Sequence, residues 1–186
     1  RYDISKNTIE EVYKENGLSG YRGALTFKGE NAASPSVYLG ALGDQAKVLR
    51  FDQGFQPGDK PVTVFESDTG HTSVRAMAEH DGAMCIGVLT LDQVVSEQET
   101  TVQEVSEPES SEGNLEIKLA TDPAIGNWST IADINDFADC SPRTDQAAAG
   151  QCGIWDMISY NGFLYAFIGT GYVHDSENNG YCVYKG

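Results

Sequence analysis

The sequence predicts an all-β fold in which one short antiparallel sheet is repeated three times along the chain. The composition favours strands and tight turns, because the 186 residues include 9 Tyr, 7 Phe and 20 Gly. Three segments align with one another, each an apolar strand that ends in one residue followed by glycine: residues 21–29, 74–82 and 154–162. A chain of this length has room for one domain with a sizeable core.

Each aligned segment predicts a β-hairpin. The strands end in the dipeptides Lys28-Gly29, Asp81-Gly82 and Asn161-Gly162. A two-residue type I′ turn needs positive φ, so Asp-Gly and Asn-Gly are strong turn signals and Lys-Gly is a weak one. Further strands are expected after each turn (37–40, 84–87, 164–167), after a variable loop (46–51, 115–119, 181–184) and before each copy (9–13, 62–65, 128–132). Residues 9–13 also fit one helical turn with a capping box, but the repeat favours a strand there.

Four antiparallel strands in each unit, joined by variable loops, are typical of the blades of a β-propeller. The predicted fold is therefore all-β and β-propeller-like, with about three four-stranded blades that make up half or a fragment of a ring. We divide the single domain into repeats at about residues 9–52, 62–122 and 128–186. The alternative is an ordinary β-sandwich whose hairpins are alike by chance.

The open ends of such a ring predict a partner, because propellers typically close with about four to eight blades. The chain begins with a fourth-type strand and ends with a third-type strand, so one copy can complete the last blade of another. We expect a homo-oligomer, such as two chains in a six-bladed ring, or a second chain that completes the ring. The rival interpretation is that further blades were removed by processing or lie on a separate chain.

The charge balance excludes two classes of partner. With 12 Lys and Arg against 28 Asp and Glu, the formal net charge is -16. Nucleic acids and anionic membrane surfaces bind proteins that have clustered Lys and Arg, so neither is expected as a partner of this acidic chain. No apolar run is long enough to insert into a membrane. The chain begins at Arg1 without Met, which suggests a removed leader or a piece of a longer precursor.

The cysteines and one sequon favour a secreted or cell-surface location. The four cysteines allow full pairing, and Cys140 and Cys152 bracket a short loop that a disulfide would stabilise by about 2–3 kcal/mol. The pairing of Cys85 and Cys182 is left open. Asn127 begins an Asn-Trp-Ser sequon, which would carry a glycan only in a eukaryotic secretory route.

Residues 92–114 interrupt the second copy with an acidic segment. It contains six Glu and no Lys or Arg, and it buries too little apolar area to offset the entropy of ordering. We expect a flexible acidic loop; the alternative is an ordered arm that adds a strand to a neighbouring molecule.

The candidate binding residues lie where the first strand of each blade would line a central channel. Arg22, Arg75 and Trp155 occupy equivalent positions of the repeat, and Asp156 follows the last of them. Guanidinium groups and an indole around one opening would suit an anionic or glycan ligand. The alternative is structural, in which each Arg holds a neighbouring blade or pairs with a carboxylate such as Asp156.

No catalytic residue and no cofactor are predicted. The sequence lacks the common nucleophile, zinc and phosphate-binding motifs, and His71 and His174 lie in loops without a recognisable nucleophile nearby. His80 is interpreted as a satisfied or exposed side chain. Two loop clusters offer oxygen ligands that would make Ca²⁺ a weak possibility: Asp133, Asp136 and Asp139; and Asp175, Glu177 and Asn178.

The chain resembles bacterial β-propeller repeat proteins of mostly unassigned function. The residues that carry the resemblance are Gly20-Tyr21-Arg22-Gly23, Ser73-Val74-Arg75, Asp122-Pro123 with Asn127-Trp128, and Ile154-Trp155-Asp156-Met157 with Gly162-Phe163-Leu164-Tyr165. The third copy departs from the pattern because Trp155 stands where the others have Arg. The resemblance implies a fold and no activity.

Two functions are consistent with this sequence. The first is a non-enzymatic extracytoplasmic module that binds a protein or glycan partner or forms part of an assembly. The second is a propeller hydrolase or lyase that acts on polysaccharide in the channel, for which convergent acid and base groups would be needed.

Overall fold

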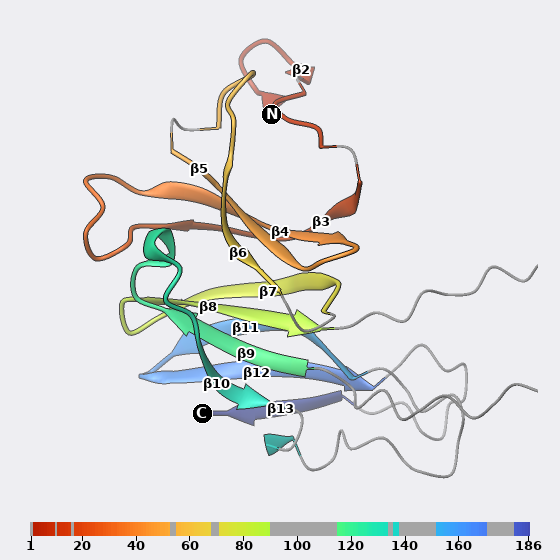
Figure 1. Cartoon of the computed structure of the whole chain (residues 1–186), viewed down its shortest axis with the longest axis vertical. Coiled ribbons are helices and arrows are strands. Elements are labelled where there is room, and N and C mark those ends of the chain that lie inside the picture. The colour runs from red at the N-terminus through yellow and green to blue at the C-terminus, as the bar shows by residue number, and fades with distance from the viewer. Residues whose placement is uncertain are drawn as a thin grey trace, which may run out of the picture.

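The protein is an all-β chain, as the sequence predicts (Figure 1). The computed structural model describes residues 2–9, 11–15, 17–52, 55–67, 71–89, 115–133, 136–137, 152–170 and 181–186. Among these residues the helical structure is of the 3-10 type and comprises η1 (Pro123–Ile125) and the single residue Asp136. No helix in the described ranges has the length and apolar character needed to cross a membrane. The acidic segment 92–114 lies outside them.

The strands form three sheet units in chain order. Unit 1 contains β3 (Leu18–Phe27), β4 (Ser36–Gly43), β5 (Lys47–Phe51) and β6 (Val62–Glu66). Unit 2 contains β7 (Ser73–His80), β8 (Ala83–Leu89), β9 (Leu115–Ala120) and β10 (Ser129–Asp133). Unit 3 contains β11 (Cys152–Tyr160), β12 (Phe163–Thr170) and β13 (Tyr181–Lys185). Within each unit, consecutive strands pair antiparallel.

Units 1 and 2 join into one strongly curled antiparallel sheet. The junction is a single residue pair, Leu42 with Ser73, so β4 passes into β7 at one end only. Beyond that point the two units stack face to face, and unit 3 stacks on unit 2 as a separate sheet (Figure 1). The first strands of the three units are neighbours in the stack, because β7 contacts both β3 and β11.

Two apolar cores fill the spaces between units. We call the face of a unit that points to the following unit its forward face, and the opposite one its rear face. In unit 3 the forward face is the one that points away from unit 2. The forward face of unit 1 packs on the rear face of unit 2 around residues such as Phe27, Val48 and Met77. The forward face of unit 2 packs on the rear face of unit 3 around Ile117 and Ile154.

Two of the three predicted hairpin turns have the expected geometry. Asp81-Gly82 and Asn161-Gly162 both have positive φ at each residue and connect strands with two-residue loops, as a type I′ turn requires. The prediction of a Lys28-Gly29 turn is wrong. Strand β3 pairs with β4 from Phe27 to Ser36, and the intervening loop is attached to unit 2 by the Glu30 N–H, which donates to Thr121 O at 3.3 Å.

The predicted strand at residues 9–13 is also wrong. The N-terminal strands are β1 (Tyr2–Asp3) and β2 (Thr8–Ile9), which pair with each other, and residues 11–15 carry no strand. That segment instead covers part of the rear face of unit 1. Val12 is buried, its carbonyl accepts from Gly58 N, and the Tyr13 ring meets Phe51 edge-on at 5.4 Å. The apolar pair therefore caps a sheet face rather than extending a sheet edge.

The spacing between units is set by glycines at one repeated position. Gly40 in β4 and Gly87 in β8 both lie opposite the residue that follows the bulge in the first strand of their own unit. A Cβ on Gly40 would lie 2.6 Å from Val74 O, and a Cβ on Gly87 would lie 3.0 Å from Ile154 Cβ. Each glycine thus receives a β-branched residue of the following unit, at a distance that excludes a Cβ at Gly40 and would require Ile154 to shift slightly at Gly87.

We expect Gly40→Ala to lower the free energy of unfolding by about 1–3 kcal/mol, because the added methyl group forces β7 away from β4. The matched control is Gly20→Ala, since Gly20 also lies in a strand of unit 1 but has nothing within 4 Å of an added Cβ. The control should change stability by less than about 0.5 kcal/mol. Urea unfolding with linear extrapolation measures both, and equal losses would contradict the proposed role of Gly40.

Candidate functional site

The three aligned candidate residues are each the extra residue of a β-bulge. The strand register shifts at Arg22 in β3, at Arg75 in β7 and at Trp155 in β11. A bulge bends its strand and redirects the side chain of the unpaired residue, and bulges occur often beside binding sites. The sequence alignment therefore identified one structural position in three units, although it did not predict the bulges themselves.

The structure brings two of these residues together. The Arg75 guanidinium carbon lies 3.6 Å from the centre of the Trp155 ring, so a cation of unit 2 stacks on an indole of unit 3. The contact stabilises by about 0.5–2 kcal/mol, depending on how far it is removed from water. Arg75 is thus held by an aromatic ring of the neighbouring unit.

The other two candidates, Arg22 and Asp156, take no part in this stack. Arg22 is exposed on β3. Asp156 is exposed on the forward face of unit 3, and its Oδ1 accepts a hydrogen bond from the Met157 N–H at 2.8 Å. The alternative in which Asp156 is the partner of an arginine therefore has no support from the contacts of the described residues.

The forward face of unit 3 is a second candidate site, and it is exposed and apolar. Five large apolar side chains lie on it with 39–62% of their surface exposed: Ile158, Tyr160, Phe163, Phe167 and Val183. Patches of this kind on a folded protein mark interaction surfaces.

Strand register shows that the same face is buried in the other units. Val183 pairs with Phe167 of β12, which stands at the position of Gly40 in unit 1 and of Gly87 in unit 2. Gly40 pairs with Val48 and Gly87 pairs with Ile117, so Val48 and Ile117 are the counterparts of Val183. Val48 is 0% exposed and Ile117 is 4% exposed, whereas Val183 is 58% exposed. Where units 1 and 2 have Gly40 and Gly87, unit 3 has Phe167.

Sequence reasoning missed this face although it carries a signal. Residues 163–168 read Phe-Leu-Tyr-Ala-Phe-Ile, which is apolar at every position rather than at alternate ones. A strand with that pattern is apolar on both faces of its sheet, as in sheets that are covered on both sides.

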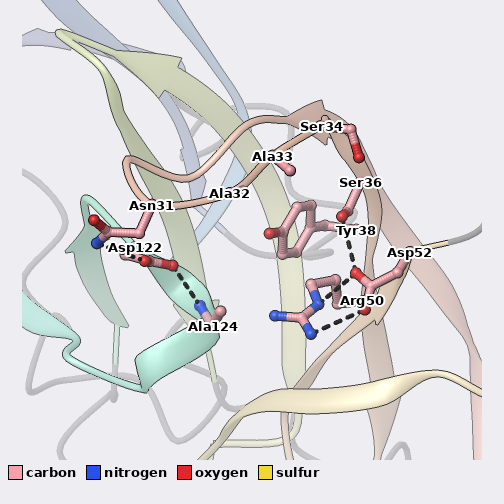
Figure 2. A pocket seen from close by; sticks show the side chains of 10 residues that line it. All are labelled: Asn31, Ala32, Ala33, Ser34, Ser36, Tyr38, Arg50, Asp52, Asp122 and Ala124. Atoms are coloured by element: carbon pink, nitrogen blue, oxygen red, sulfur yellow. Dashed lines mark hydrogen bonds and ion pairs between the residues drawn. The ribbon is translucent and has the colours of Figure 1, made fainter.

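A pocket of about 260 Å³ lies between units 1 and 2, beside η1 (Figure 2). On one wall Asp52 accepts from Ser36 Oγ at 2.9 Å and pairs with the Arg50 guanidinium at 2.7 Å. Burial raises the pKa of Tyr38, which stands on the same wall, so its phenol stays protonated at neutral pH.

The carboxylate on the opposite wall of the pocket is also engaged. Asp122 is buried, and its two oxygens accept from Asn31 Nδ2 and from the Ala124 N–H, both at 3.1 Å (Figure 2). Asp122 caps η1 and holds the long β3–β4 loop of unit 1. The pocket is therefore a polar junction between units in which both carboxylates have internal partners.

A buried Ser–His pair was missed from sequence. Ser67 Oγ lies 3.0 Å from His71 Nδ1, and both residues are buried. The backbones of both residues also bond to Ala46, with 3.0 Å from Ser67 N to Ala46 O and 2.8 Å from Ala46 N to His71 O. No recognisable nucleophile is expected near His71 from the sequence, and the hydrogen-bond partner found there is Ser67. Because solvent does not reach the pair, it acts as a structural link between β6 and β7 rather than as a nucleophile and base.

Some of the other predicted site residues lie outside the described residues. Cys140 lies outside them, as do Asp139 and the second proposed Ca²⁺ cluster, and of Cys152 only its place at the start of β11 is described. Cys85 is a free thiol in the core, and burial raises its pKa to about 11. Asn127 is exposed between η1 and β10.

Two further predictions concern His80 and the possible Ca²⁺ ligands. His80 Nδ1 lies 2.9 Å from Ser159 Oγ across the contact between units 2 and 3, which agrees with its interpretation as a satisfied side chain. Among the residues that the structure describes, no group of three His, Cys, Asp or Glu is arranged to hold a metal ion.

No protein-family model, curated protein or solved structure matches this chain.

We expect Arg75 and Trp155 to be energetically coupled. In a double-mutant cycle of Arg75→Ala, Trp155→Leu and the double variant, the loss in the double variant should fall short of the sum of the single losses by about 0.5–1 kcal/mol. Urea unfolding gives the three values. Additive losses would show that the stack contributes nothing to stability.

Proposed function

We propose that this chain is a non-enzymatic assembly module, built of β-propeller blades, that binds a protein partner through the forward face of unit 3. The observation that carries the proposal is the exposure of Val183 and its neighbours at positions that are buried in units 1 and 2. A surface of this composition has the aromatic and aliphatic side chains that dominate protein interfaces.

The arrangement of the strands supports the propeller interpretation. In a propeller, four-stranded antiparallel sheets stand around a central axis with their first strands innermost. Here the first strands β3, β7 and β11 are neighbours, and each begins its unit with a bulge at the same position. In unit 3 no fourth strand pairs with β13 among the described residues, so the edge of that strand and the forward face beside it suit an incoming chain.

The proposed location is the cell surface or the extracellular space. The net charge of -16 keeps such a module soluble and disfavours contact with nucleic acid. The predicted Cys140–Cys152 disulfide would require an oxidising compartment.

A protein partner is favoured over a glycan by the chemistry of the face. Ile158 and Val183 lie among the aromatic residues, and aliphatic side chains offer a sugar neither hydrogen bonds nor a stacking plane. The polysaccharide hydrolase alternative needs two convergent carboxyl groups that are free to act. The pocket carboxylates Asp52 and Asp122 are both engaged by partners, so this alternative gains no support there.

A photo-cross-linking amino acid at position 160 tests the proposal in the cells that produce the protein. We expect a discrete adduct, because Tyr160 lies on the forward face of unit 3 and is 62% exposed. The matched control carries the same group at position 131 in β10, where Ile131 is 48% exposed but lies outside that face. No adduct at position 160, or the same adducts at both positions, would count against the proposed interface.

A further inference from the structure

We infer that the partner on the forward face of unit 3 is a second copy of this chain, whose Arg22 is placed beside Trp155. This inference rests on the proposed function and identifies its partner. It follows from three features of unit 1: an exposed first strand, an exposed arginine at the bulge, and a small residue, Ala24, at the position that would face Asp156 of unit 3.

On the rear face of unit 1 the first strand leaves exposed the positions that make the joints inside the chain, while Ala41, Leu49 and Phe51 on the next two strands are buried. Val74 and Ile154 fill the glycine sites of the preceding units, and the corresponding residue in β3 is Tyr21, which is 38% exposed. The next rear-face position holds Met77 in β7 and Ala24 in β3, and Ala24 is also exposed. The chain thus has an exposed forward face at one end of the stack and an exposed rear-face strand at the other.

The bulge residues supply a specific contact for joining these two ends. Inside the chain, the step from unit 2 to unit 3 puts Arg75 against the Trp155 ring. The same step, taken from unit 3 of one copy to unit 1 of another, brings Arg22 of the second copy beside Trp155. Arg22 is exposed on β3 in the single chain. A ring of two chains would therefore place each Trp155 between two arginines, one from each chain.

The side-chain volumes at this joint are exchanged relative to the joints inside the chain. In the step from unit 1 to unit 2 the small residue belongs to the forward face, since a Cβ on Gly23 would lie 2.8 Å from Met77 Cγ. The corresponding positions in the proposed joint are Asp156 on the forward face and Ala24 on the rear face. The larger side chain at this position has moved to the other partner, whereas at the glycine position Phe167 faces Tyr21, so the proposed joint is wider there than the joints inside the chain.

The geometry predicts a closed ring rather than a face-to-face dimer. Forward face and rear face are different surfaces, so the contact is heterologous, and three units from each of two chains give six, a number within the range at which propellers close. Each ring contains two identical joints, and no exposed forward face remains.

The first experiment measures the mass of the purified full chain over a dilution series by light scattering after size exclusion. We expect twice the 20.1 kDa chain mass, falling to the monomer on dilution. Ile158→Glu should give a monomer, and Ile131→Glu, at a similarly exposed strand isoleucine outside the face, should not. Val183→Glu provides a second face variant, and circular dichroism must show that every variant is folded.

The second variant pair tests the arginine. Arg22→Glu should weaken the dimer by roughly tenfold or more, because it removes the cation beside the indole. Lys28→Glu makes the same change in net charge at an exposed residue just after β3, and it should leave the dimer within about twofold of the wild type.

Mixing the variants distinguishes a ring from a face-to-face dimer. Ile158→Glu damages the forward face and Arg22→Glu damages the rear side of the joint, so a ring of either variant alone has two defective joints. In a mixed ring, both substitutions fall in one joint and the other joint is intact. Dimer should therefore reappear in the mixture. A cross-linker at position 160 of the purified chain should map to β3 of the second copy.

Three results would overturn the inference. They are a monomer at every concentration, a dimer that Arg22→Glu leaves intact, and a mixture of variants that stays monomeric. If the purified chain is a monomer but position 160 still forms an adduct with another protein in cells, the proposed function stands and only the second copy is excluded.

Discussion

The stacking of one unit on the next depends on the contact between a glycine in the second strand and a β-branched residue in the following unit. Face-to-face sheets usually lie about 10 Å apart, and side chains fill the space between them. At Gly40 the space is too small for a methyl group, and at Gly87 a methyl group would fit only if Ile154 shifted by a few tenths of an ångström. The β-branched residue comes immediately before the bulge, so close approach and bulge occur at the same point of the strand. That coincidence explains why Arg75 reaches the next unit: the bulge directs its side chain out of the ladder just where the sheets come nearest.

Periodicity predicted the parts of this fold that are local in sequence. The Asp81-Gly82 and Asn161-Gly162 turns depend on the φ preferences of two residues, and they formed as expected. The errors arose where long-range contacts decide the conformation. Lys28 and Gly29 resemble a turn, but the loop that follows them is held by Asp122, 91 residues beyond its partner Asn31. Residues 9–13 were assigned a strand by analogy with the other copies, whereas Val12 and Tyr13 cover a sheet face instead.

The sequence predicted that the candidate residues share one position in the repeat, but it did not predict the contact between them. Aligning Arg22, Arg75 and Trp155 required only the repeat, but the stack of Arg75 on Trp155 depends on how two units pack, which no single copy encodes. The exposed face of unit 3 shows the opposite case. Its apolar residues are evident in the sequence, yet their exposure becomes meaningful only when register shows that Val48 and Ile117 hold the same position in buried surroundings. Comparison between copies within one chain thus substitutes for comparison between proteins.

The strongly acidic character of the chain also limits how it can associate. At a net charge of -16 two copies repel each other, so an ion-pair interface would have few cations to use. The described cations Lys47, Arg50 and Lys118 already have carboxylate partners in their own units. Besides the hydrogen bonds between units, the joints therefore rely on apolar area and on the pairing of arginine with an aromatic ring, neither of which needs an ion pair. Phe167 fits this requirement, because an aromatic side chain in place of glycine would add buried area at the proposed joint between two chains. The glycine contact suits units that fold together on one chain, whereas the aromatic face suits a joint whose stability must overcome both the entropy of association and the charge.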